Sequence, residues 1–305
     1  MSDLPDLPDL PDVLAWIGRV TGRPPVDHRP VAGGQTASTR LRVTLDDGSS
    51  VFVKAAALGT WEGTALTAEI AVHRDLHAPF LPSALADEID EDQGYARLLL
   101  PDLSARYWPP PWRPGDVDAV LSTLAEVAAH PPPVALRPVA ADREALDGWP
   151  KVALEPGPFA RLGLGDATWM EQCLPVLVDA SSRADLRGDE LLHFDVRSDN
   201  LCLADDRSVQ LVDWSWATRG PGALDVLAWL PSLAMEGGPM PDAVMPGADP
   251  ALVALLAGMW AWNAGQPDLP SAPGLRRLQR ALLRQVLPWA CRCLDLPEPL
   301  EHANG

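Results

Sequence analysis

The feature that most constrains the fold of this chain is the separation of its strand-like and helix-like patterns. Before residue 101, apolar residues alternate with polar ones over Thr39–Leu45, and a tight turn at Asp47-Gly48 leads into an apolar strand at Val51–Val53. Beyond residue 101, apolar residues recur mostly at helical spacing, with one short hairpin-like stretch at Leu201–Val212. The sequence therefore predicts an α+β protein with a small antiparallel-sheet lobe followed by a larger, mostly helical lobe.

The character of the sequence changes after Leu100, where the predicted lobes meet. Residues 107–112 (Tyr-Trp-Pro-Pro-Pro-Trp) form a stiff segment that is typical of a boundary. We expect an N-terminal lobe over residues 1–103 and a C-terminal lobe over residues 104–305. Further strands are expected near Pro30–Gly33, Leu85–Ile89 and Tyr95–Leu100. Helices are expected at Val13–Val20 (started by Asp12), Trp61–His77, Asp116–His130, Thr168–Ser182, Asp225–Leu233, Asp249–Asn263 and Gly274–Leu294.

An excess of acidic residues limits the partners of this chain. Its 42 acidic and 24 basic residues give a formal net charge of −18, which repels nucleic acid and anionic membrane surfaces at long range. The N-terminus has no basic or apolar signal segment, and the longest apolar run, Ala251–Trp262, is shorter than the ~20 residues that cross a bilayer. The cysteines show no paired or zinc-like spacing, as is usual in a reducing compartment. We therefore expect a cytoplasmic protein that binds neither nucleic acid nor membranes.

The residues most indicative of chemistry are His193, Asp195 and Asn200, which form the pattern H-x-D-x-x-x-x-N, and Asp213, which follows a predicted strand. Phosphoryl transfer to a hydroxyl needs a carboxylate that orients the acceptor. It also needs an amide and a second carboxylate that hold magnesium against the phosphates. Each part is weak evidence alone, but their combination at this spacing favours a phosphotransferase.

Two other interpretations fit the same residues. Asp and Asn cluster in loops for turn chemistry alone, and His193 is then a buried histidine of the core. Alternatively, His193, Asp195 and Asp213 are the ligands of a metallohydrolase. Three further features of the N-terminal lobe favour phosphoryl transfer over both.

Lys54 ends an apolar strand, where a lysine is a poor choice unless it binds phosphate, and it is one of only two lysines among 24 basic residues. Glu69 lies in the next predicted helix, where it can pair with Lys54. Gly33 and Gly34 form a turn at which a backbone can approach phosphates closely.

The whole arrangement resembles the aminoglycoside phosphotransferase and choline kinase-like family, small-molecule kinases with a bilobal protein-kinase-like fold. The resemblance implies a role for each matching position. Asp195 matches the catalytic aspartate, and Asn200 and Asp213 match the two magnesium ligands. Lys54 matches the lysine that holds the α- and β-phosphates, and Glu69 matches the glutamate that positions that lysine.

The same resemblance implies the nucleotide-binding segments. Gly33–Ser38, which begins with Gly33 and Gly34, matches the flap over the nucleotide. Leu98–Leu103, which includes Leu98 and Leu100, matches the hinge whose backbone grips the adenine. Asp225 matches a structural aspartate that supports the catalytic loop.

The chain departs from the family pattern at two positions of this loop. The family usually has glycine between the histidine and the aspartate, where this chain has Phe194. Arg197 stands where antibiotic kinases often have histidine and many protein kinases have a lysine that touches the transferred phosphate. We expect Arg197 to act on that phosphate, although a structural arginine that pairs with Asp199 or another nearby carboxylate fits equally well.

Together these features predict an O-phosphotransferase that uses ATP or GTP with Mg²⁺ and acts on a hydroxyl of a small molecule. The segment between Asp213 and Asp225 is too short for an activation loop that docks a peptide. The expected acceptor is an aminoglycoside, an amino sugar or a related antibiotic, with a role in resistance or self-protection. We expect a monomer or a homodimer. A non-catalytic nucleotide-binding module on the same fold is the main alternative.

Overall fold

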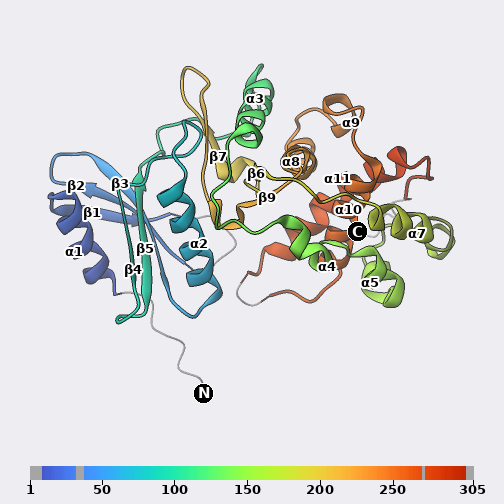
Figure 1. Ribbon diagram of the computed structural model, residues 1–305, viewed down its shortest axis with the longest axis horizontal. Helices are drawn as coiled ribbons and strands as arrows, with labels where there is room; N and C mark the ends of the chain where they lie inside the picture. Colours follow the sequence, from blue (N-terminus) through green and yellow to red (C-terminus); the bar gives the residue numbers. More distant parts are fainter. Residues whose placement is uncertain (1–8, 32–37, 270–271, 300–305) are drawn as a thin grey trace. The chain divides into compact units, whose positions relative to one another are not determined.

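The computed structural model describes residues 9–31, 38–269 and 272–299. Gly33 and Gly34, expected in the phosphate-binding turn, lie outside these described residues. The chain divides into two compact units, whose elements are labelled in Figure 1. The first unit consists of the residues up to Pro109 together with Asp199–Ala217, and the second consists of Pro110–Ser198 together with the residues from Thr218 onward. The hairpin-like stretch that carries Asp213 therefore groups with the N-terminal strands.

The first unit is built on a five-stranded antiparallel sheet with the strand order β1-β2-β3-β5-β4. The strands span Pro25–Pro30 (β1), Thr39–Leu45 (β2), Ser50–Ala57 (β3), Ala86–Asp90 (β4) and Tyr95–Pro101 (β5). The turn predicted at Asp47-Gly48 joins β2 to β3, and Gly48 adopts a φ of 82°, which glycine reaches without strain. Because β3 is the central strand, Lys54 lies between Arg40 on β2 and Leu98 on β5.

Two helices cover the two faces of this sheet (Figure 1), namely α1 (Leu10–Thr21) and α2 (Trp61–Asp75). Val13, Trp16 and Ile17 of α1 pack against the face that carries Val53. Leu66 and Ile70 of α2 pack against the opposite face. Successive side chains of a strand point to opposite faces, so Lys54, next to Val53, points to the side of α2.

The helix α1 starts three residues earlier than the sequence pattern predicted. Asp9, not Asp12, is its N-cap, and Pro11 lies in the first turn, where a proline costs no backbone hydrogen bond. Asp12 instead forms an ion pair with Arg97 of β5, whose side chain is fully buried. The Arg97 guanidinium also lies 3.9 Å from the centre of the Tyr95 ring. Asp12 thus ties α1 to the sheet.

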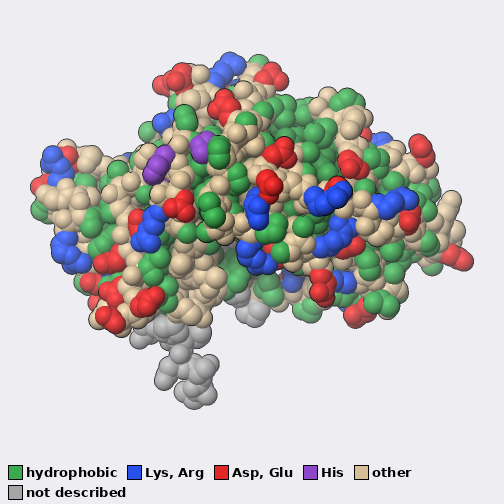
Figure 2. Space-filling view, viewed as in Figure 1, with side chains coloured by type: hydrophobic (Ala, Val, Ile, Leu, Met, Phe, Trp, Pro, Cys, Tyr) green, Lys and Arg blue, Asp and Glu red, His purple; other side chains and the backbone are tan. Residues whose placement is uncertain are grey.

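The edge strand β4 is acidic. Acidic side chains gather at the turn between β4 and β5 (Figure 2), where Glu88, Asp90, Glu91 and Asp92 lie close together. Like charges along an edge strand discourage pairing with a strand of another chain.

The remaining three-residue strands form two small antiparallel pairs. In the first unit, β7 (Leu201–Leu203) pairs with β8 (Val209–Leu211), which confirms the predicted hairpin. In the second unit, β6 (Glu190–Leu192) pairs with β9 (Thr218–Gly220), a pairing that the sequence pattern did not predict because three residues are too few to show alternation.

The second unit is otherwise helical. The helices expected there span Asp116–Ala129 (α3), Ala167–Ser182 (α7), Ala223–Met235 (α8), Pro250–Ala264 (α10) and Leu275–Cys293 (α11). Four short helices were not expected, namely Arg143–Leu146 (α4), Trp149–Leu154 (α5), Gly157–Ala160 (α6) and Pro241–Val244 (α9). Such short segments hold too few turns for a periodic pattern. A 3₁₀ turn lies at Val139–Asp142 in this unit, and another, Trp214–Trp216, lies in the first unit. A third, Ser198–Asn200, lies where the chain passes from the second unit to the first.

The helix α10 is the core of the second unit. Most of its side chains are buried, and it packs against α5, α7, α8 and α11. A helix that is apolar all round is expected at such a central position. Among the described helices, none is both long and apolar enough to span a membrane.

The close approach of α2 to β3 depends on Gly63. A Cβ atom at this position would lie 2.0 Å from the carbonyl oxygen of Ala57. We expect Gly63→Ala to lower the free energy of unfolding by about 1–3 kcal/mol, because α2 must move away from β3. Urea unfolding measures this loss. Gly247→Ala is the control, since a Cβ there meets nothing within 4 Å, and an equal loss in both variants would contradict the packing argument.

Candidate active site

The first unit holds a buried lysine between two carboxylates. The Nζ of Lys54 donates to Oε1 and Oε2 of Glu69 at 2.9 and 2.8 Å, and it lies 3.2 Å from Oδ1 of Asp213. Lys54 and Glu69 are both buried, with 7% and 1% of their surface exposed. The sheet alternation, the position of α2 and the hairpin β7–β8 together place these three side chains.

The carboxylates of this cluster stabilise the charged form of Lys54. Burial alone lowers the pKa of Lys54, but the carboxylates of Glu69 and Asp213 outweigh it, so the pKa of Lys54 is raised above its usual value. Burial also raises the pKa of Glu69, against the effect of the Lys54 ammonium. The contact of Nζ with both oxygens of Glu69 is the geometry of an ammonium bound to an ionised carboxylate. Lys54 and Glu69 therefore form an ion pair at neutral pH, and the carboxylate of Asp213 lies beside the Lys54 ammonium.

Asp213 and Asn200 lie on neighbouring segments of the first unit. The backbone N–H of Val212 donates to the Asn200 carbonyl at 2.9 Å, which holds the segment before Asp213 beside Asn200. Asp213 has a φ of 67°, a left-handed conformation that aspartate tolerates better than most residues. The next residue, Trp214, is fully buried and stacks on Phe80 with ring centres 5.8 Å apart. This anchor fixes the backbone from which the Asp213 carboxylate extends.

The second unit holds the loop of Asp195 by its backbone. The carboxylate of Asp225, at the start of α8, accepts hydrogen bonds from the N–H of His193 at 2.8 Å and from the N–H of Phe194 at 2.7 Å. The N–H of Asp195 donates to Nδ1 of His193 at 3.2 Å. His193 is fully buried, and its Nδ1 is engaged in the loop, so it is poorly suited to bind a metal. Asp225 thus supports the loop, as the resemblance implied.

The departure at residue 194 has a structural consequence. Phe194 adopts a φ of 63°, in the left-handed region where a side chain crowds the backbone. Glycine reaches this region freely, which explains why a glycine suits this position of the motif. The two hydrogen bonds to Asp225 hold the strained backbone in place.

Arg197 forms an ion pair with Asp195 itself through Nη1 and Oδ1. Both side chains are largely buried, with 17% and 24% of their surface exposed, so water screens this pair less than a surface pair. Arg197 thus pairs with a nearby carboxylate, that of Asp195.

Glu236, which follows α8, supports the same loop and was not predicted. Its carboxylate accepts a hydrogen bond from the hydroxyl of Ser198 and one of 3.0 Å from Nε1 of Trp112. No sequence motif marks Glu236, because its contacts with Ser198 and Trp112 form only when α8 brings it beside the loop.

The predicted hinge residues Leu98 and Leu100 lie on β5 with buried side chains. In the sheet, Leu98 lies opposite Lys54 of β3 on one side and opposite Asp87 of β4 on the other, so both neighbouring strands flank its backbone. The pairing of β5 with β4 ends at Leu99. Within residues 9–31, 38–269 and 272–299, no group of three or more His, Cys, Asp and Glu side chains is placed to hold a metal ion.

Comparison with known proteins decides the family. The model of the phosphotransferase enzyme family matches residues 27–251. The chain belongs to this family. No curated protein matches the chain.

Solved structures of phosphotransferases share the fold of this family member. Spectinomycin phosphotransferase in complex with ADP and spectinomycin has a TM-score of 0.54 at 13% identity, over 90% of this chain and 88% of that one. A mutant aminoglycoside phosphotransferase with ADP and hygromycin B has a TM-score of 0.54 at 16% identity, over 93% and 96%. Choline kinase from Streptococcus pneumoniae has a TM-score of 0.52 at 11% identity, over 89% and 98%.

These findings confirm three predictions from the sequence: the resemblance to the aminoglycoside phosphotransferase and choline kinase-like family, the α+β protein-kinase-like fold, and an enzyme that phosphorylates an alcohol group. The roles of the individual residues stay predictions.

The strain at residue 194 can be measured by comparing two substitutions. We expect Phe194→Gly to be more stable than Phe194→Ala by about 1 kcal/mol, because the left-handed backbone is strained for alanine and not for glycine. Both variants lose the same ring, so this difference isolates the backbone. At the exposed helical position Glu126 of α3 the order should reverse. The same order at both positions would show that Phe194 carries no strain.

The burial of Asp225 should make stability depend on pH. Burial raises the pKa of Asp225 from 3.8 to about 6, although the hydrogen bonds from His193 and Phe194 act in the opposite direction. The Asp225 carboxyl therefore stays protonated up to a higher pH in the folded state than in the unfolded state. The stability that this gives is complete below about pH 4 and is lost as the pH rises through 6, by about 3 kcal/mol in all.

Urea unfolding of the wild-type protein and of Asp225→Asn between pH 4 and 7 measures this effect. The free energy of unfolding of the wild type should fall relative to that of the variant as the pH rises. A constant difference between them would contradict a raised pKa at Asp225.

Proposed function

We propose that this chain transfers the γ-phosphate of ATP or GTP to a hydroxyl group of a small molecule, with an aminoglycoside, an amino sugar or a related antibiotic as the acceptor class. The observation that carries the proposal is the buried ion pair of Lys54 and Glu69 with Asp213 beside it. A buried ammonium is costly unless it has a task, and binding the α- and β-phosphates is the task that suits its strand position.

Lys54 and Glu69 act on the nucleotide. Glu69 fixes the ammonium by two hydrogen bonds, so that Lys54 loses little side-chain freedom when it binds phosphate oxygens. The turn at Gly33 and Gly34 is proposed to cover the phosphates. The adenine is proposed to bind the backbone of the hinge at Leu98–Leu103, beyond Leu99, where pairing with β4 ends.

Asn200 and Asp213 fit a magnesium ion by the chemistry of their donors. Carboxylate and amide oxygens are hard ligands of the kind that Mg²⁺ prefers, and the backbone bond between Val212 and Asn200 keeps the two segments together. Magnesium, when bound, neutralises charge on the β- and γ-phosphates. The position of Asp213 next to Lys54 puts this donor set beside the proposed phosphate-binding ammonium.

Asp195 and Arg197 act on the transfer itself. Asp195 orients the acceptor hydroxyl for in-line attack on the γ-phosphorus and accepts its proton. The new O–P bond forms as the bond from the γ-phosphorus to the β–γ bridging oxygen breaks, and the nucleoside diphosphate leaves. Arg197 holds the carboxylate of Asp195 and donates to the transferred phosphoryl group, on which negative charge is spread during transfer. Asp225 keeps the loop in shape for both residues.

The acceptor class rests on two indications. The solved relatives include complexes with spectinomycin and hygromycin B. The net charge of −18 suits a cationic acceptor such as an aminoglycoside. Resistance or self-protection against such an antibiotic is the proposed biological role, and a cytoplasmic location is part of the proposal.

A screen of hydroxylated antibiotics, amino sugars and nucleosides for acceptor-dependent ADP release tests the proposal. We expect at least one acceptor to stimulate release and to gain a phosphate by mass spectrometry. Asp195→Asn should lower turnover by about two orders of magnitude or more while nucleotide affinity stays nearly unchanged. Magnesium-dependent nucleotide binding with no release for any acceptor would instead identify a non-catalytic module.

Lys54→Arg keeps the positive charge but replaces a compact ammonium by a larger planar group. Lys54 is buried between Glu69 and Asp213, which leaves little room for the larger group, so we expect turnover to fall about a hundredfold or more. Lys151→Arg is the control, because Lys151 is only half-buried and its ammonium, within the described residues, donates to no group besides the Glu144 carbonyl. Equal turnover of the two variants would refute the role of Lys54.

Arg197→Ala should lower kcat far more than it raises the KM for ATP, because its contact with the phosphoryl group is made mainly during transfer. Arg187→Ala is the matched control. Arg187 forms an ion pair with Asp185 at the same spacing of two residues, but at the surface. An unchanged kcat in the Arg197→Ala enzyme would make Arg197 a structural residue.

A further inference from the structure

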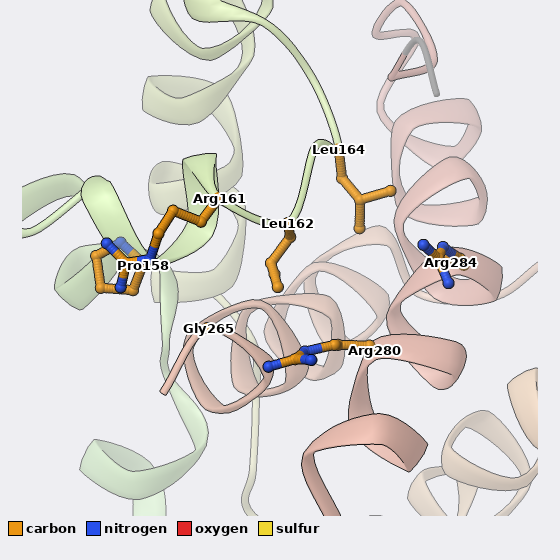
Figure 3. A pocket seen from close by; sticks show the side chains of 7 residues that line it. All are labelled: Pro158, Arg161, Leu162, Leu164, Gly265, Arg280 and Arg284. Atoms are coloured by element: carbon orange, nitrogen blue, oxygen red, sulfur yellow. The ribbon is translucent and has the colours of Figure 1, made fainter. Parts of the chain in front are cut away.

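A pocket of about 400 Å³ lies in the second unit, between the segment that follows α6, the C-terminal end of α10 and the helix α11 (Figure 3). Arg161, Arg280 and Arg284 line it, together with Leu162 and Leu164. None of the lining residues belongs to the proposed active site. The volume is that of a site for a small organic molecule.

The charge of this pocket is opposite to that of the chain. Three arginines line it, and no carboxylate is among the described lining residues, although the chain has 42 acidic residues in all. Arg161 and Arg280 form no ion pair with any residue of the described ranges. The positive charges of Arg161 and Arg280 are therefore not balanced by a carboxylate of the described residues, and a bound anion would neutralise them.

The geometry of α11 concentrates this charge. Arg276, Arg280 and Arg284 follow one another at intervals of four residues and so lie along one face of the helix. Nε of Arg276 donates to the carbonyl of Pro267, and Nε of Arg280 donates to the carbonyl of Ala264 at 3.1 Å. These contacts fix the stem of Arg280 at the end of α10. Within the described residues, its two Nη atoms form no hydrogen bond.

The other part of the pocket is apolar. Figure 3 shows Leu162 between Arg161 and Arg280, and Arg280 extending past the end of α10 toward Gly265. Gly265 has no room for a larger residue, because a Cβ there would lie 2.8 Å from the backbone of Pro158. The pocket thus offers arginine donors to an anionic group and leucine side chains to an organic body.

We propose that this pocket binds a phosphate monoester of a small organic molecule. A phosphate ester carries up to two negative charges and three terminal oxygens, which the planar forks of two or three arginines match in charge and geometry. The site is additional to the proposed phosphotransferase function, and its test needs no nucleotide and no turnover.

Isothermal titration calorimetry of the full chain with glucose 6-phosphate, inorganic phosphate and glucose tests the proposal. We expect saturable binding of glucose 6-phosphate, weaker binding of inorganic phosphate and none of glucose. Arg161→Gln should weaken binding about tenfold, and Arg161→Gln with Arg280→Gln should abolish it. The Arg161 side chain is exposed and donates no hydrogen bond within the described residues, so the single variant tests the site without unfolding it.

Arg277→Gln is the control, because Arg277 is an exposed arginine of α11 that does not line the pocket. Its affinity for glucose 6-phosphate should match that of the wild type. The proposal is overturned if no phosphate compound binds, or if the Arg161 and Arg277 variants lose affinity equally, which would indicate general charge attraction.

The ligand has two possible sources, a phosphorylated product of the enzyme itself or another organic phosphate. Competition separates them. Displacement of glucose 6-phosphate by the purified product of the acceptor reaction assigns the pocket to the product. Binding of glucose 6-phosphate that the product does not displace assigns it to another phosphate ester. Neither result bears on the proposed phosphotransferase function, which is tested separately by acceptor-dependent ADP release.

Discussion

The buried ion pair of Lys54 with Glu69 is the interaction on which the first unit depends. Each of the two charges is costly to remove from water, and the contact between them, together with Asp213 beside Lys54, offsets that cost. The contact requires β3 to present Lys54 toward α2, and it requires α2 to approach β3 closely at Gly63. Asp213 completes the cluster, which explains why the hairpin β7–β8 belongs to the first unit although it comes much later in the sequence.

The second unit uses a buried carboxylate in a comparable way. Asp225 holds the N–H groups of His193 and Phe194, and these bonds repay part of the cost of burying its charge. They also hold Phe194 in a backbone conformation that its side chain disfavours. In each unit, a buried acidic residue thus holds a residue of the proposed machinery in place: Glu69 holds Lys54 in the first unit, and Asp225 holds the loop of Asp195 in the second.

The sequence predicted the parts that depend on local pattern and motif. Alternation along β2 and the apolar run at Val51–Val53 identified two paired strands, and the H-x-D-x-x-x-x-N motif identified the loop. Lys54 was expected at the end of the second strand, but β3 continues through three buried alanines to Ala57, so Lys54 lies within the strand. The contact of Arg197 with Asp195 and that of Glu236 with Ser198 depend on which rotamers and which distant elements meet in the folded unit. The start of α1 was misplaced because Asp9 and Asp12 are equally good caps. The ion pair with Arg97, which engages Asp12, cannot be seen in a linear pattern.

The geometry of Lys54 also limits how the nucleotide can bind. An ammonium has three donors, and two of them point to the oxygens of Glu69 while the third faces Asp213. Lys54 can therefore hold a phosphate oxygen only if one of these contacts is given up. Glu69 is the more deeply buried partner, with 1% of its surface exposed, and it would be left as an isolated charge. Asp213 is 26% exposed and can turn to another cation, so under the proposed function it is the partner that Lys54 would exchange for phosphate.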